Sequence, residues 1–436
     1  FADLKRVVDF KVGFDTCVSV TAVVMLVQNI VSLAAFDGKL STVSGAAAML
    51  MAVNSLSKTL KLKRTLSGLE VIATSEPKSA VTAAAGAPAE AIASGAVEGE
   101  VVALSTRETV NIRSYLKNCG YESPFDLKAK ILFVIGVAAA VIVGIVTGIV
   151  TDALTGLTLA ALTLCACFPA CAVLTAELPM YLAASKLSRY GAMLAGFKGA
   201  YDLNLSNVLA VKTSDLFPES TVTLYDMKPL GKNEIGHSLV DAAAVAIAAK
   251  SPLAPIFKSI IGDVPEKDMP DITGVQYEDK MGITGWIGDR TILIGNRNLM
   301  QGHNVSVPPA SVDQKILRAG YFPVYIACDG VPCLLFIVKY EADANIAAEL
   351  QRVCSTGMTV VVYPEDPNAS DMMLCDYFGL PNDAIKVIRH NGRVAYDRAT
   401  VPAESTSAPA GYRKSVCGLL SAVTSAINMS SAITIL

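Results

Sequence analysis

Five stretches of this chain carry no charged side chain over about the length that a helix needs to cross a membrane. They are residues 16–36, 40–57, 131–151, 153–176 and 415–436. A helix of about 20 residues spans the roughly 30 Å hydrocarbon core of a bilayer. The pattern predicts five membrane-spanning segments, of which the second is the shortest. Buried helices of a large soluble protein are the alternative, but core helices rarely stay uncharged over five such runs.

Basic residues lie before the first segment, after the second, before the third, after the fourth and before the fifth. The connections at residues 37–39 and at Asp152 are short by comparison. Lys and Arg concentrate on the cytoplasmic side of membrane proteins. We therefore expect an integral protein of a bacterial cell membrane, with two cytoplasmic loops at residues 58–127 and 187–412.

Composition agrees with a membrane protein, since only 17% of the residues are charged and the mean hydropathy is +0.47. The ten cysteines have no regular spacing, so we expect reduced thiols rather than a disulfide framework. The chain begins without a methionine and stops inside its fifth hydrophobic run, which suggests a piece of a longer protein. We expect no nucleic-acid partner.

The smaller loop starts as a basic helix that continues from the second segment. It then becomes rich in Ala, Gly and Pro over residues 80–95, and a short strand is expected near residues 100–104. Such a composition buries little apolar surface. The pattern predicts a small or poorly ordered domain.

The larger loop alternates strand and helix patterns. Strands are predicted at residues 208–211, 291–294, 324–328, 334–338 and 359–362, and helices at 237–250 and 342–354. The last helix-to-strand step, with Gly357 between, is typical of the α/β unit of a parallel sheet. The middle of the loop, residues 226–318, has strands and turns of its own and is expected to be an inserted domain.

Residues 281–300, with the sequence MGITGWIGDRTILIGNRNLM, carry the longest recognisable motif. They resemble the nucleotide-binding domain of heavy-metal P-type cation-transporting ATPases, with its G-x-G-V-x-G turn and following V-G-N. Gly282, Gly285, Gly295 and Asn296 match, whereas Lys280 replaces the first glycine. Glycines there would let the backbone approach adenine and phosphates closely. A glycine-rich hairpin without a ligand is the alternative.

Upstream, Glu234-Ile235-Gly236-His237-Ser238-Leu239 resembles the S-E-H-P-L element of the same family, with Ser238 in place of the proline. The family's histidine contacts the nucleotide, so His237 is a candidate contact. An ordinary histidine at the start of a helix is the other interpretation.

Residues 210–217 resemble the phosphorylation motif F-D-K-T-G-T-L-T. Lys212, Thr213 and Leu216 agree, but Val211 stands in place of the nucleophilic aspartate. Phosphoryl transfer to an enzyme needs an oxygen nucleophile in line with the γ-phosphate, which valine lacks. Asp215, four residues further on, is interpreted as a solvated loop aspartate in preference to a cation ligand.

Residues 360–368 resemble the family's V-x-x-L-T-G-D-N-P. Asp366 is retained, whereas Pro364, Glu365 and Pro367 replace Thr, Gly and Asn. Glu365 would place negative charge beside a phosphate, which is unfavourable. We find neither the G-D-G-x-N-D-x-P motif that holds Mg²⁺ nor a convincing T-G-E. Lys212, Thr213 and Asp366 are therefore remnants of a catalytic site without a nucleophile.

The fourth hydrophobic run resembles the C-P-C membrane site of heavy-metal pumps, with Pro169 kept but Phe168 and Ala170 as its neighbours. Cys167 and Cys171 are four residues apart and share one helix face, so they are candidate metal ligands. The preferred interpretation is small apolar cysteines packed in a helix. Glu177, further along, marks either the cytoplasmic end of the segment or a polar cavity.

The resemblance implies a polytopic α-helical membrane domain plus a cytoplasmic α/β domain of the HAD-like, Rossmannoid class, with an inserted α+β nucleotide-binding domain. The expected parts are a first hairpin (1–64), a reduced actuator-like loop (65–127), a second hairpin (128–186), a phosphorylation-type domain (187–225 and 319–411), a nucleotide-binding domain (226–318) and an incomplete fifth segment (412–436).

We interpret the chain as a divergent heavy-metal P-type ATPase relative that binds ATP, has lost the acceptor aspartate and acts as a pseudo-pump or accessory protein. An ATP-driven cation transporter with a displaced acceptor is the first alternative, and a structural membrane interaction protein is the second. The cofactors implied are ATP and, less directly, Mg²⁺. The partners implied are a membrane, a nucleotide, a metal cation and another protein.

Overall fold

The computed structural model describes residues 14–35, 43–121, 123–167, 170–219, 221–231, 235–262, 264, 269–413 and 415–435. The chain divides into two compact units. The helical unit comprises Phe1–Thr74, Ser114–Tyr201 and Asn428–Leu436, and the α/β unit comprises Ser75–Arg113 and Asp202–Ile427. Each unit is built from segments that are far apart in the sequence.

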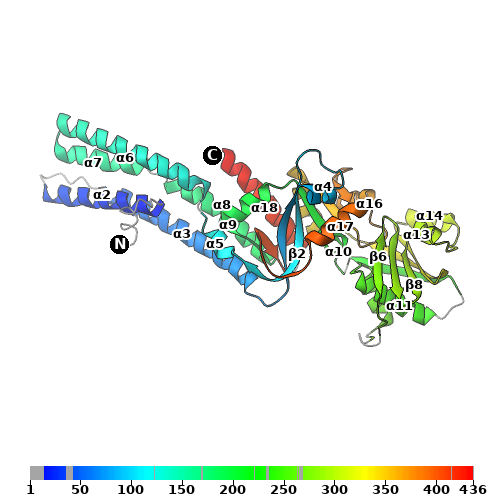
Figure 1. Ribbon diagram of the computed structural model, residues 1–436. Coiled ribbons are helices and arrows are strands. Elements are labelled where there is room, and N and C mark those ends of the chain that lie inside the picture. Colours follow the sequence, from blue (N-terminus) through cyan, green and yellow to red (C-terminus); the bar gives the residue numbers. More distant parts are fainter. Residues whose placement is uncertain are drawn as a thin grey trace. The chain divides into compact units, whose positions relative to one another are not determined.

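The helical unit contains long helices that lie side by side (Figure 1). Its elements are α2 (Phe14–Ala34), α3 (Ser44–Ile72), α5 (Tyr115–Cys119), α6 (Pro124–Val150), α7 (Ala153–Cys167), α8 (Ala170–Arg189), the short β3 (Ala192–Leu194) and the start of α9 (Gly196–Asn204). Helices α6 and α7 pack on each other, as do α3 and α8, and α2 contacts both α3 and α7.

Glycine lets α6 and α7 approach closely. A Cβ atom on Gly156 of α7 would lie 2.7 Å from the carbonyl oxygen of Gly144 and 2.7 Å from the Cα of Gly148, both on α6. Small residues at such a crossing allow backbone contact between apolar helices. The pair α3 and α8 is joined differently, because Arg64 Nε lies 3.0 Å from Glu177 Oε2 with both side chains buried.

Two of the five hydrophobic runs form helices long and apolar enough to cross a membrane within the described residues, namely Cys17–Ala34 and Ile131–Val150. The other three predicted spans are not shown by the described residues. The second run is only the first part of α3, which continues through a basic stretch to Ile72. The fourth run is divided between α7 and α8, with residues 168–169 outside the described part. The fifth run begins α18 (Val416–Ile435), where residues 416–429 form a shorter apolar helix.

The α/β unit contains a mixed sheet with the strand order β12-β11-β4-β2-β1-β14, and β13 pairs with β2. The strands are β1 (Lys78–Ala85), β2 (Val102–Arg113), β4 (Val208–Lys212), β11 (Thr359–Tyr363), β12 (Ile385–Val387), β13 (Ala403–Ser407) and β14 (Ala410–Tyr412). Strands β12, β11, β4 and β2 pair in parallel, whereas β1 is antiparallel to β2. The predicted strands at 208–211 and 359–362 and the helix before the second are confirmed.

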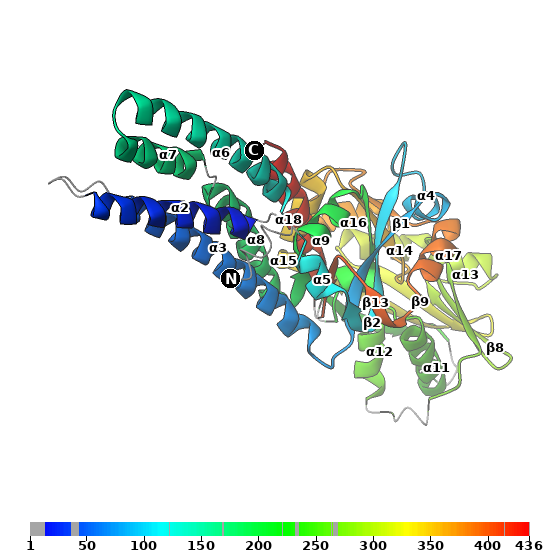
Figure 2. The same ribbon diagram turned by 60° about the vertical axis from the view of Figure 1, so that its left-hand side comes forward.

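The Ala- and Gly-rich loop joins this sheet instead of forming a poorly ordered domain. Strand β2 pairs with β4, with Ala103 opposite Val208, so residues 78–113 share a sheet with the acceptor strand. Helix α4 (Ala87–Ala93) packs against α17 (His390–Ala399), and its Ala89 and Ile92 are fully buried (Figure 2). Alanines bury little area each, but they let a helix and a sheet approach closely.

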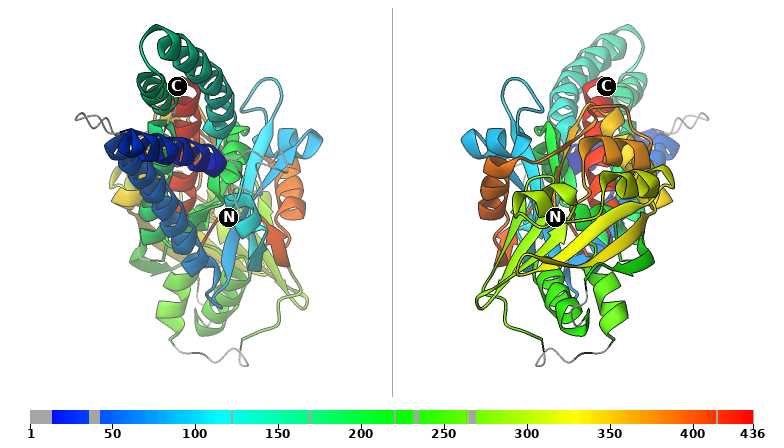
Figure 3. Two further views of the ribbon diagram at one scale, coloured as in Figure 1. Left: turned by 90° about the vertical axis from the view of Figure 1, so that its left-hand side faces the viewer. Right: turned by 90° about the vertical axis from the view of Figure 1, so that its right-hand side faces the viewer.

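The inserted part is an antiparallel six-stranded sheet with the order β5-β10-β9-β8-β7-β6, which the right panel of Figure 3 faces. Its strands are β5 (Val222–Pro229), β6 (Gly274–Glu278), β7 (Gly282–Ile287), β8 (Arg290–Gly295), β9 (Phe322–Cys328) and β10 (Val331–Tyr340). The sheet thus draws on residues 222–340, a wider range than the expected 226–318. The predicted strand pair at 324–328 and 334–338 and the strand at 291–294 are confirmed.

Helices cover both faces of the six-stranded sheet. Helix α11 (Ile235–Ala248) and α12 (Ala254–Ile261) pack on the face that carries Gly285 and Phe336. Helix α13 (Arg297–Gly302) and α14 (Ala310–Arg318) bury the other face, around Leu293 and Tyr325. The remaining helices of the α/β unit are α10 (Thr213–Leu216), α15 (Ala344–Ser355) and α16 (Asp371–Phe378).

Candidate functional site

Val211, which the sequence analysis aligned with an acceptor aspartate, lies at the carboxyl end of β4, where ligands bind in open α/β sheets. It is fully buried and pairs in register with Val362 of β11. An isopropyl group enclosed between neighbouring strands has no oxygen to offer.

Glu365 fills the space in front of this strand end. Its Oε2 accepts a hydrogen bond of 3.2 Å from the backbone N–H of Ser214, and its Oε1 lies 3.6 Å from Lys212 Nζ. Burial raises the pKa of this carboxyl to about 7, while Lys212 lowers it. A backbone N–H beside a lysine is an arrangement that binds anions. Here the protein's own carboxylate occupies it, an arrangement that the sequence analysis did not anticipate.

Lys212 and Thr213 hold the two strand ends together. Thr213 Oγ1 donates to the carbonyl oxygen of Tyr363 at 3.0 Å and accepts from the N–H of Glu365 at 3.4 Å. These bonds fasten the turn after β4 to the turn after β11. Both predicted remnants thus lie beside Glu365, and their observed contacts are structural.

Asp215 is not a solvated loop residue, which corrects that interpretation. Its carboxylate accepts from the N–H of Lys212 at 3.1 Å and so caps the short helix α10. Desolvation raises its pKa, and the bond from Lys212 opposes this. The carboxylate faces a polar cavity of about 350 Å³ that Lys212 and Lys250 also line. The Asp215 carboxylate is therefore engaged in capping the turn to which it belongs.

Asp366 is buried in a hydrogen-bond network that reaches the inserted sheet. The Tyr340 hydroxyl lies 2.8 and 2.7 Å from its two carboxylate oxygens, and the Asn368 N–H donates to one of them at 2.7 Å. Tyr277 Oη donates to the Asp366 carbonyl oxygen at 2.9 Å. Burial raises the pKa of Asp366 to about 6.

These contacts do not suit a magnesium site. Mg²⁺ needs ionised oxygen ligands in near-ideal octahedral geometry, whereas both carboxylate oxygens of Asp366 already have protein partners. Among the described residues no group of three or more His, Cys, Asp or Glu side chains is placed to hold a metal ion. Asp366 acts instead as an anchor for the strand β10.

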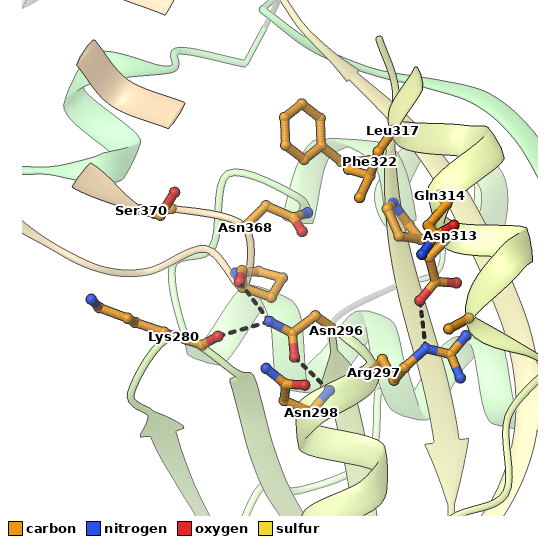
Figure 4. Close-up of a pocket in the computed structure, with 14 residues that line it drawn as sticks. Lys280, Asn296, Arg297, Asn298, Asp313, Gln314, Leu317, Phe322, Asn368 and Ser370 are labelled. Atoms are coloured by element: carbon orange, nitrogen blue, oxygen red, sulfur yellow. Dashed lines mark hydrogen bonds and ion pairs between the residues drawn. The ribbon is translucent and has the colours of Figure 1, made fainter. Parts of the chain in front are cut away.

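A second cavity, of about 400 Å³, lies where the inserted sheet meets the loop after β11 (Figure 4). Lys280 supplies positive charge, while the charge of Arg297 is paired with the Asp313 carboxylate, which also lines the cavity, at 2.7 Å. Asn298, Gln314 and Asn368 supply amides, while Leu317 and Phe322 supply apolar surface. This size and mixture are typical of small-molecule sites. The chemistry suits an anionic ligand that also carries a flat ring.

Asn296 holds the wall of this cavity together. Its Oδ1 accepts from the N–H groups of Asn298 and Leu299 and so caps α13, and its Nδ2 donates to the Lys280 carbonyl oxygen at 2.7 Å. A longer contact of 3.5 Å joins Nδ2 to the carbonyl oxygen of Pro367 (Figure 4). The side chain lines the cavity while fixing hairpin, helix and loop to one another.

The predicted glycines divide between the two faces of the sheet. Gly282 and Gly295 are cross-strand partners, and a Cβ on Gly282 would lie 2.6 Å from the Cα of Gly295. A Cβ on Gly285 would lie 2.5 Å from Val245 Cγ1 on the opposite face. The glycines are thus needed for contacts within the protein. Lys280, in the first-glycine position, keeps the left-handed backbone that favours glycine, with φ of +58°.

His237 lies in the first turn of α11 and is exposed. It does not line the cavity of Figure 4, so of the five predicted nucleotide contacts only Asn296 does. The sequence analysis missed Asn298, Gln314, Phe322 and Asn368. Asn298 and Asn368 lay within motifs that it examined, whereas Gln314 and Phe322 lay outside them.

The candidate metal ligands of the membrane segment are not brought together by any described contact. Cys167 lies against α6, because a Cβ on Gly136 would be 2.6 Å from Cys167 Cβ. The backbone of Cys171 belongs to α8, but its side chain and all of Pro169 lie outside the described residues. The metal site remains a prediction.

The chain matches no known protein-family model. Among solved structures, it is similar to a zinc-transporting PIB-type ATPase that was crystallised in two states. In the first, the identity is 12%, the match covers 100% of this chain and 84% of that chain, and the TM-score is 0.43. In the second, the identity is 15%, the coverage is 100% and 85%, and the TM-score is 0.43. The N-domain of HMA8, a copper-transporting P-type ATPase, is 20% identical over 26% of this chain and 97% of that chain, with a TM-score of 0.21.

Proposed function

We propose that this chain is a membrane protein related to the heavy-metal P-type ATPases that binds a nucleotide and does not form a phosphoenzyme. It acts as a pseudo-pump or accessory protein. One observation carries the proposal: Val211 occupies the acceptor position, and the Glu365 carboxylate occupies the anion site formed by Ser214 and Lys212.

Two obstacles oppose phosphoryl transfer at this strand end. The side chain in line with the strand is a hydrocarbon, so no bond to phosphorus can form there. An incoming phosphate would also meet the Glu365 carboxylate, because the donors that suit phosphate are already hydrogen-bonded to it. Asp215 does not replace the nucleophile, since it caps α10.

The nucleotide assignment rests on the cavity of Figure 4. Lys280 and the amide of Asn298 suit phosphate oxygens, and Phe322 offers an aromatic ring edge or face for a base. The adjoining residues 281–300 carry the motif that resembles the family's nucleotide-binding domain. Motif and cavity therefore point to the same part of the inserted sheet.

The acceptor part of the proposal is tested by incubating membranes that contain the protein with γ-labelled ATP and quenching in acid. We expect no protein-bound label. A label that survives acid and is released by hydroxylamine would mean that an acyl phosphate forms, and the transporter alternative would then replace the proposal. A P-type pump with an intact acceptor, labelled in parallel, is the positive control.

The nucleotide part is tested by titrating the purified chain with ATP. Reversing the charge of Lys280 with Lys280→Glu should weaken binding by about tenfold or more, because the carboxylate would face the phosphates. Lys315→Glu, on the exposed side of α14 and outside the cavity, makes the same charge change and should leave affinity nearly unaltered. Equal effects of the two variants, or no ATP binding by the unaltered chain, would refute this part alone.

A further inference from the structure

Two cysteines meet at the closed end of the β9–β10 hairpin. Cys328 is the last residue of β9 and pairs with Val331 across the turn. The register slips between Pro332 and Leu334, so Cys333 is the extra residue of a β-bulge. The bulge brings Cys333 beside Cys328, close enough for a hydrogen bond between the thiols to shift both pKa values, and Cys333 Sγ also donates to the carbonyl oxygen of Val331 at 3.3 Å.

The pair lies under the first turn of α11. Cys328 is the cross-strand partner of Ile292, so its side chain lies on the sheet face that α11 covers. The hydroxyl of Ser238, in that first turn, hydrogen-bonds both thiols. A hydroxyl donor and the positive end of a 14-residue helix both stabilise a thiolate. Asp241 and Asp329 act in the opposite direction.

The two thiols share a proton. The hydrogen bond between them lowers the pKa of Cys333 to about 6 and raises that of Cys328, because the Cys328 S–H donates to the Cys333 thiolate. The two residues also differ in burial, since Cys328 is half-buried and Cys333 is buried with 4% of its surface exposed. Cys328 is thus the more exposed residue of the pair.

We propose that Cys328 and Cys333 form a reversible disulfide, so that this hairpin is a thiol-oxidation site for low-molecular-weight disulfides. Cys328 passes its proton to the neighbouring Cys333 sulfur and attacks one sulfur of the small disulfide, whose other sulfur leaves as a thiolate. The Cys333 sulfur then attacks Cys328, displaces the second small thiol and gives up its proton. The protein loses two electrons and two protons, and the small disulfide becomes two thiols. This site is independent of nucleotide binding.

The chain supplies its own internal control. Trypsin releases residues 319–339, which contain Cys328 and Cys333, and residues 353–386, which contain Cys354 and Cys375. Cys354 is half-buried and Cys375 is buried in the same unit, so these two thiols resemble the proposed pair in access. Burial and the charge of Cys375 both raise the pKa of Cys354, whereas the proposed pair contains one thiol, Cys333, with a lowered pKa.

The test treats the full chain with a series of reduced-to-oxidised glutathione ratios, alkylates the remaining thiols and maps the peptides without reduction. We expect residues 319–339 to become two hydrogen masses lighter and resistant to alkylation, while residues 353–386 stay alkylated. Dithiothreitol should restore both alkylation sites. Alkylation of both cysteines of 319–339 at every ratio, or a glutathione adduct without the internal bond, would overturn the proposal.

Two variants separate the roles of the residues. Cys333→Ser should stop the reaction at a mixed disulfide between Cys328 and glutathione, visible as one glutathione adduct on 319–339. Ser238→Ala should slow formation of the internal disulfide about tenfold, because the thiolate loses one donor. If Cys333→Ser gave no adduct while the unaltered chain formed the internal bond, Cys328 would not be the attacking residue and the proposed order would be wrong.

Discussion

The Lys212 ammonium lies 3.6 Å from Glu365 Oε1, and the two residues come from the ends of neighbouring parallel strands. Parallel pairing places Lys212 opposite Tyr363, so the turn that follows each strand leads into the same space. An acidic side chain in the turn after β11 then reaches the lysine that ends β4. The contact forms an internal ion pair at this edge of the sheet.

Stability should fall as the pH rises from about 4.5 to about 7, and Glu365 should cause much of the fall. The folded pKa of Glu365, about 7, exceeds its ordinary value of 4.5. In that window the unfolded chain releases this proton and the folded chain keeps it, so rising pH favours unfolding, by roughly 3 kcal/mol in all. Asp366, with a pKa of about 6 instead of 3.8, acts in the same direction.

The check is urea unfolding of the unaltered chain and of Glu365→Gln across this pH range. The amide cannot ionise, so the variant should lose most of the pH dependence above pH 6, where Asp366 contributes little further change. If the free energy of unfolding changed with pH equally in both proteins, Glu365 would ionise normally in the folded state.

Tyr340→Phe should destabilise the α/β unit by about 1–3 kcal/mol. The hydroxyl is within hydrogen-bond distance of both oxygens of a buried carboxylate, and its removal leaves that carboxylate under-satisfied. Tyr377→Phe is the matched control, because Tyr377 belongs to the same ring cluster and makes no hydrogen bond to Asp366. Equilibrium unfolding in urea measures both. Equal losses would assign the effect to ring packing.

Lys280→Gly should stabilise the fold by about 1 kcal/mol. A lysine at φ of +58° carries a steric cost that glycine avoids. The comparison is Lys315→Gly within α14, which should destabilise by about 1 kcal/mol because glycine is a poor helix former. The two variants should shift the midpoint of thermal unfolding in opposite directions. A loss at position 280 would mean that the lysine side chain contributes more than its backbone costs.

Gly285→Ala should cost about 1–3 kcal/mol, because its Cβ would overlap Val245 on α11. Shortening the partner in Gly285→Ala with Val245→Ala should recover part of the loss, so the two changes should couple favourably. Gly236→Ala, where a Cβ meets open space, should be neutral or stabilising. Strict additivity of the double variant in urea unfolding would contradict a direct contact.

Arg64→Met should destabilise the helical unit by about 3–5 kcal/mol, since it removes the cation that lies 3.0 Å from the buried Glu177 carboxylate. Replacing both residues, with Arg64→Met and Glu177→Leu, should restore most of this loss because no buried charge remains. Thermal unfolding in detergent compares the three proteins. A double variant no better than the single one would show that the ion pair itself is required.

The local elements could be predicted from the sequence because they depend on near neighbours. Alternation and turn residues predict β9, β10 and β11, and the helix before β11 follows from its apolar spacing. The positions of Lys212 and Thr213 at the end of β4 could also be predicted from the sequence. The lack of an oxygen atom in the Val211 side chain could be read from it directly. These features depend on residue type and spacing alone.

The partners of those elements were decided by tertiary structure. An uncharged run only indicates that a helix avoids water, and the side chains of residues 416–429, which looked like part of a span, are largely buried. The Ala-rich strand β1 looked weak alone and is held by its pairing with β2. The sequence by itself determined that position 211 carries a valine, which has no oxygen nucleophile. Only parallel pairing of β4 with β11 decided that Glu365 lies beside Lys212, because hydrogen bonds between distant segments bring the two strand ends together.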